Sequence, residues 1–128
     1  MMAVLLLTTV IVSFLAALIM YKYMASCSRH KVQAIYVAER IIEEQRRQPF
    51  ANLVSFNYGA VSIDNNGTFN TTADDYMGSA LVTVTNLDAY RRRVKVEVDW
   101  KERSPIGGPA VNRKEFCSTD IADEPQLN

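Results

Sequence analysis

An unbroken apolar run at the N-terminus restricts the fold of this chain more than any other feature. Residues 1–20 contain no charge, no glycine and no proline. As a helix, a run of this length spans about 30 Å, which is the thickness of the hydrocarbon layer of a bilayer. We therefore expect residues 1–23 to be a transmembrane helix. The side chains expected to face lipid, or other helices in an assembly, are Val4, Leu5, Leu7, Val10, Phe14, Leu15 and Leu18.

The residues after this run are typical of a membrane boundary. Tyr21, Lys22 and Tyr23 are the amphipathic aromatic and cationic types that favour the headgroup layer. A cleaved signal peptide would need a basic stretch before a shorter apolar core, and this chain has neither. A lipoprotein signal is a further alternative, because residues 24–27 loosely resemble a lipobox, with Met24 where leucine is usual.

The same helix is expected to continue well beyond the membrane. No helix breaker occurs before Pro49, so residues 1–48 predict one helix of roughly 70 Å. Within residues 24–48 the pattern changes to a single apolar stripe with charged residues on the other faces. This half needs a partner surface. The stripe residues assigned to the core are Ile35, Ala38, Ile41 and Ile42.

The C-terminal part predicts a small antiparallel sheet, which gives an α+β fold. Residues 49–78 are interpreted as a connecting region with a short strand near 60–63, and residues 64–67 as a plain turn rather than a calcium loop. Residues 79–122 are expected to form the sheet, with strands at 80–85, 93–100 and 114–122, and residues 123–128 a flexible tail. The inward-facing strand residues are expected to be Val82, Val84, Val94, Val96, Val98 and Trp100.

Charge and motifs argue against several functional classes. The 14 basic and 14 acidic residues balance, so no nucleic-acid partner is indicated. We expect no enzyme activity, no cofactor and no metal: the single histidine, His30, is interpreted as a surface residue near the membrane. Cys27 and Cys117 form either one disulfide or two free thiols.

Several segments together resemble the minor pilins of type IV pili and the pseudopilins of type II secretion. Residues 1–7 look like the stretch just after the prepilin cleavage motif, residues 38–50 resemble the end of the family's long helix, and residues 94–100 and 114–122 resemble two of its strands. The family's cleavage motif and its early glutamate have no counterpart here. Either Met1 is an internal start in a longer reading frame with a basic leader upstream, which we favour, or this chain is not processed as the family is. Such a leader also reconciles the basic residues after the span with a periplasmic C-terminal domain.

The resemblance implies a structural subunit that assembles into a filament. It implies prepilin-type processing, a single-pass location in the bacterial inner membrane with a periplasmic domain, and later incorporation into a pilus or pseudopilus. The implied partners are other pilin subunits, the inner-membrane assembly platform and the lipid bilayer. The alternative is a single-span anchored adaptor or lipoprotein with a small periplasmic binding domain. The reading frame upstream of Met1 distinguishes the two.

Overall fold

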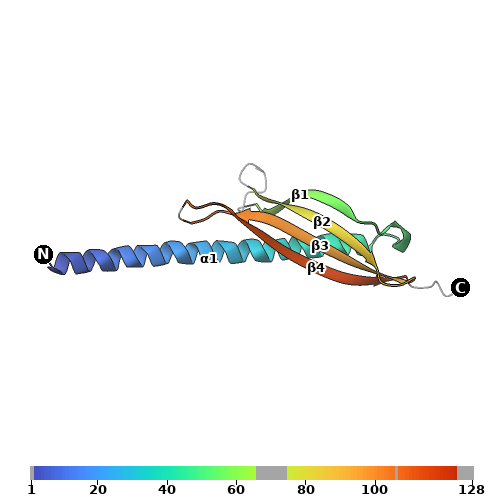
Figure 1. Ribbon diagram of the computed structural model, residues 1–128, viewed down its shortest axis with the longest axis horizontal. Helices are drawn as coiled ribbons and strands as arrows, with labels where there is room; N and C mark the ends of the chain where they lie inside the picture. The colour runs from blue at the N-terminus through green and yellow to red at the C-terminus, as the bar shows by residue number, and fades with distance from the viewer. Residues whose placement is uncertain (1, 66–74, 106, 124–128) are drawn as a thin grey trace.

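One long helix packed on one antiparallel sheet makes up this computed structural model, which describes residues 2–65, 75–105 and 107–123 (Figure 1). The expected α+β class is confirmed. The elements are α1 (Met2–Arg46), the short 3-10 helix η1 (Phe50–Asn52), β1 (Phe56–Asp64), β2 (Tyr76–Asn86), β3 (Arg91–Glu102) and β4 (Val111–Ala122).

The helix α1 runs without a break for 45 residues, or about 68 Å at the standard rise. Its N-terminal half projects away from the sheet, and its C-terminal half lies along it (Figure 1). The helix ends at Arg46, where the backbone N–H groups of Arg47 and Gln48 turn back to the carbonyls of Glu44 and Gln45. Pro49 follows and cannot extend the helical hydrogen bonding.

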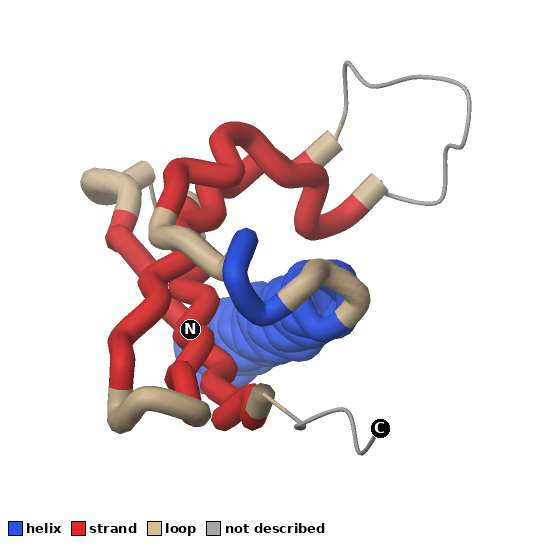
Figure 2. The backbone as a smooth tube through the Cα atoms, turned by 90° about the vertical axis from the view of Figure 1, so that its right-hand side faces the viewer, coloured by secondary structure: helices blue, strands red, loops and turns tan. Residues whose placement is uncertain are grey.

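The sheet is a simple meander with strand order β1-β2-β3-β4, and every neighbouring pair is antiparallel. The expected hairpin is confirmed: Val82 pairs with Val96 across β2 and β3, and Val96 pairs with Cys117 of β4. Viewed along the helix, the strands curve around one side of α1 (Figure 2). The helix therefore fills the concave face of the sheet.

The core lies between this concave face and the C-terminal half of α1. Ala38, Ile41 and Ile42 are buried as expected, with Ala34 and Val37 beside them. The short side chains of Ala34 and Ala38 allow close packing of the helix against the sheet. β1, β2 and β3 contribute buried apolar side chains from every second position, because successive residues of a strand face opposite sides of the sheet. These side chains are Val61, Ile63, Ala80, Val82, Val94, Val96, Val98 and Trp100, and Leu53 closes the core from the connection after the helix.

Two residues assigned to the core are less buried than expected. Ile35 is only half-buried, because it follows Ala34 by one residue and each residue turns the helix by about 100°. Its side chain therefore lies at the edge of the stripe, and Val37 occupies the core instead. Val84 is also half-buried, although it packs against the core from the far part of β2.

The assignment of residues 49–78 to a connecting region was wrong. This stretch contains all nine residues of β1 and the start of β2. Two register shifts, between Asn57 and Gly59 and between Ser62 and Asp64, interrupt the alternation of buried and exposed residues. Gly59 has a φ of 90°, which suits the first irregularity. The predicted turn at 64–67 and tail at 123–128 lie mostly outside the described residues.

Candidate functional site

The exposed half of α1 is the first candidate site. All seven side chains expected to face lipid or other helices are exposed, with fractions between 44% for Leu18 and 66% for Leu5. The three hydroxyl groups in this half bond back to helix carbonyls. Thr8 donates to Leu5, Thr9 to Leu6 and Ser13 to Thr9, over 2.8 to 2.9 Å. The surface therefore presents almost no unsatisfied polar group.

This surface is apolar all round and is not covered by the rest of the molecule. The most apolar stretch of the helix has none of its surface buried against the sheet. Length and composition are those of a helix that can cross a membrane. An uncovered apolar surface of this size requires lipid or other protein around it. The side chains placed here by the sequence thus form one continuous contact surface.

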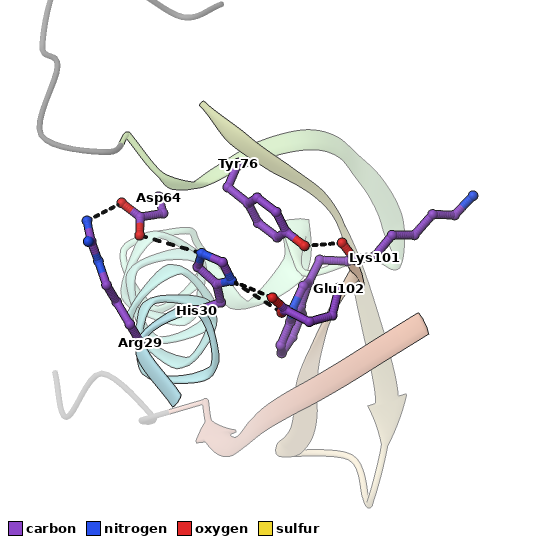
Figure 3. A network of polar contacts seen from close by, with 7 residues as sticks. Arg29, His30, Asp64, Tyr76, Lys101 and Glu102 are labelled. Carbon is purple, nitrogen blue, oxygen red and sulfur yellow. Dashed lines mark hydrogen bonds and ion pairs between the residues drawn. The ribbon is translucent and has the colours of Figure 1, made fainter. Parts of the chain in front are cut away.

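The second candidate site is a buried polar cluster where α1 enters the sheet domain (Figure 3). His30 lies on the buried face of the helix with 7% of its surface exposed. Its Nδ1 is 3.0 and 3.2 Å from the two carboxylate oxygens of Glu102, at the end of β3. The indole Nε1 of Trp100 donates to the same carboxylate over 3.0 Å. Glu102 thus links the helix to β3.

A second carboxylate and a tyrosine enclose the other side of His30. Its Nε2 is 3.7 Å from Oδ2 of Asp64, whose Oδ1 accepts a hydrogen bond of 2.7 Å from Arg29. The ring of Tyr76 stacks on the imidazole, with ring centres 4.1 Å apart. The hydroxyl of Tyr76 donates to the carbonyl of Lys101 (Figure 3). Burial, and then the charge on Glu102, raises the pKa of Tyr76.

The interpretation of His30 as a surface residue was wrong. The helical repeat contained the relevant information, because Ala34, Ala38 and Ile41 follow His30 on the same stripe. Strand alternation likewise extends from Trp100 to Glu102, which is two residues farther along the buried face of β3. Only Asp64 could not be found this way. The register shift between Ser62 and Asp64 buries both Ile63 and Asp64, two consecutive residues.

The cluster is suited to fixing the helix against the sheet. Asp64 and Glu102 are each 4% exposed, so both carboxylates lie out of reach of a dissolved substrate. Buried charged groups are tolerated where partners surround them, as here. In the described part of the chain, no group of three or more His, Cys, Asp or Glu side chains is arranged to hold a metal ion.

Both cysteines are free thiols, so of the two sequence-based alternatives the disulfide is not formed. Cys27 lies beside Glu102 and Asn112, at the end of the sheet nearer the exposed half of α1. Cys117 lies beside Ile42 and the end of α1. The two thiols therefore occupy different ends of the interface between the helix and the sheet.

No family model matches this sequence, and comparisons with curated proteins and with solved structures returned no match.

Proposed function

We propose that this protein is a membrane-anchored structural subunit of a filament, of the type IV pilin or type II pseudopilin kind. The observation that supports this best is the division of α1 into two environments within one unbroken helix. One half is packed on a sheet, and the other is apolar and uncovered over its whole circumference. A small antiparallel sheet on such a helix is consistent with the fold of the pilin family that the sequence resembles.

The exposed half of α1 can serve two successive environments. In the bilayer it spans the hydrocarbon layer and holds the sheet domain at the periplasmic surface of the inner membrane. In the filament the same side chains pack against the helices of neighbouring subunits. Lipid and protein interiors are similarly apolar, so helix association depends on packing rather than on a large hydrophobic gain. An uncharged helix surface meets the requirements of both environments.

A charge in the span tests the proposal. We expect Leu7→Arg and Leu15→Arg to reduce membrane insertion or filament incorporation strongly, because an arginine at the centre of a span costs about 2.5–3.5 kcal/mol. Membrane fractionation and immunoblotting of sheared filaments measure the two steps separately. Leu87→Arg is the matched control, because Leu87 is 41% exposed in the turn between β2 and β3.

The outcomes separate the proposal from its alternative. Wild-type amounts of Leu15→Arg protein in both membranes and filaments would refute the proposal. If the wild-type chain inserts normally into the membrane but is never recovered in filaments, the permanently anchored adaptor is favoured. In that case the span would remain an anchor, and the sheet domain would be the binding part.

A further inference from the structure

Basic side chains gather at the end of the sheet domain that faces the span. At this end β3 finishes and β4 begins, with Trp100 paired to Arg113 and Glu102 paired to Val111. The connection between these strands projects back along α1 toward its exposed half (Figure 1). Arg103 and Arg113 flank the connection, and Lys22 lies on the helix just after the apolar run. All three are exposed, and together we call them the basic collar.

The place of Arg113 beside the helix gives the height of this collar. Arg113 lines one cavity together with Cys27 and Ser28 of α1, and it lies near the hydroxyl of Tyr23. Tyr23 is three residues beyond Met20, which corresponds to about 4.5 Å along the helix axis. The headgroup layer on each side of a bilayer is about 5–8 Å thick. With the apolar run in the hydrocarbon, Arg113 lies at the level of the lipid phosphates.

Three acidic groups at this end of the domain are engaged away from the collar. Asp64 and Glu102 are buried around His30. Two other cations at this end have acidic partners: Arg29 pairs with Asp64 at 2.7 Å and Lys31 with Glu115 at 3.0 Å. Among the described residues, no ion pair joins any collar residue to an acidic side chain.

The segment between the two arginines is also compatible with a membrane surface. Residues 104–112 contain no charged residue. Val111 at the start of β4 is 44% exposed, and Gly107 in the connection has a φ of 70°. An uncharged loop with flanking arginines can approach the headgroup layer without burying a charge, while the arginines extend to the phosphates.

We propose that the basic collar binds the headgroups of anionic phospholipids and holds the sheet domain against the bilayer surface. This inference rests on the proposed function, because the span must be in the membrane for the collar to reach lipid. Arginine suits phosphate oxygens through its planar set of donors. Each cation near an anionic membrane surface strengthens association about fivefold.

A fluorescence measurement on the full chain tests the proposal. Cys27→Ser and Cys117→Ala remove the native thiols, and Ala110→Cys places a label in the exposed connection between β3 and β4. The protein is reconstituted in lipid nanodiscs that contain a spin-labelled headgroup lipid, with or without phosphatidylglycerol. We expect strong quenching in the anionic discs. Quenching should fall to the level of neutral discs in about 1 M salt, where the Debye length is about 3 Å.

Charge variants identify the residues responsible. We expect Arg103→Gln combined with Arg113→Gln to abolish the excess quenching in anionic discs. The matched control combines Arg47→Gln with Arg91→Gln, which removes the same charge from exposed positions at the other end of the domain. This control should quench like the parent protein.

The experiment distinguishes failure of the proposed membrane span from failure of the lipid-binding proposal. A chain that does not enter the discs contradicts the proposed membrane span. Incorporated protein that is quenched equally in neutral and anionic discs overturns the lipid proposal and leaves the span intact. Equal losses in the collar variant and the control variant would also overturn it, because the effect would then follow net charge rather than the collar.

Discussion

At the scale of single residues, His30 makes polar contacts on both sides of its ring, to Glu102 through Nδ1 and to Asp64 through Nε2. Tyr76 covers its face. Asp64, Tyr76 and Glu102 belong to three different strands, β1, β2 and β3. All three contact the same turn of α1. One side chain therefore joins three strands to the point where α1 leaves the sheet.

Removal of the imidazole should weaken the domain strongly. We expect His30→Ala to lower the free energy of unfolding by about 3–5 kcal/mol, because the buried Glu102 keeps only Trp100 as a hydrogen-bond partner and the buried Asp64 loses its contact with the ring. Urea unfolding in detergent, followed by the fluorescence of Trp100, measures the change. Trp100 is the single tryptophan and bonds to Glu102.

Lys31→Ala is the control for this prediction. Lys31 is the next residue along the helix, with 58% of its side chain exposed, and its ion pair with Glu115 is at the surface. Its loss should cost less than about 1 kcal/mol. Equal small losses in the two variants would show that the buried cluster does not stabilise the junction.

At the scale of elements, the longest pairing in the sheet joins β3 to β4, from Arg91 with Ala122 to Glu102 with Val111. Its outer face is lined by charged side chains. Arg93 donates to both carboxylate oxygens of Asp120, at 2.7 and 3.0 Å. This hydrogen bond from Arg93 holds the pKa of Asp120 below its usual range. Lys95 likewise lowers the pKa of Glu97.

These lowered pKa values predict a pH dependence of stability. A carboxylate with a lower pKa in the folded state stabilises the protein above its unfolded pKa of about 4, and this contribution is lost as the pH falls through the folded value. We expect Asp120→Asn to be less stable than the wild type at neutral pH, and the difference to vanish in strong acid. Urea unfolding of both proteins at neutral pH and in strong acid measures this difference in stability.

The control for the pH prediction is Asp123→Asn, which removes one negative charge just beyond β4. Asp123 is exposed, and the structure gives its side chain no ion pair among the described residues. This variant should change stability little at either pH. A deficit of Asp120→Asn that stayed the same in acid would show that the pair with Arg93 is not its cause.

At the scale of the whole molecule, the exposed half of α1 and the far end of the sheet lie at opposite ends of one long axis (Figure 1). The two cysteines are separated along this axis. Cys27 lies fifteen residues before Ile42, the helical neighbour of Cys117, so about 22 Å of helix separates the two levels. A disulfide requires Cα atoms within about 7 Å.

The separation predicts that the thiols do not pair within one chain. Alkylation of the protein in detergent, after denaturation without a reducing agent, should add two labels per chain by mass spectrometry. An intramolecular disulfide would give no label, which would contradict the helix–sheet register. Non-reducing electrophoresis detects the different case of a bond between two chains.

Local patterns in the sequence were sufficient for the apolar span, the amphipathic half of α1 and the pairing of β2 with β3. Each depends on a period of 3.6 or of 2 that continues over many residues, and side-chain burial follows that period directly. The same periods also contained His30 and Glu102, although a charged or titratable residue is easily taken for a surface one. The exposed contact surface was thus predictable residue by residue.

Only the tertiary structure decided the position of β1, the burial of Asp64 and the state of the cysteines. The register shifts in β1 interrupt the alternation that would have identified it, and such shifts are settled by pairing with β2. Asp64 becomes buried because its partners, Arg29 and His30, arrive from a helix far away in the sequence. Long-range contacts of this kind depend on how the elements pack, which no local period encodes.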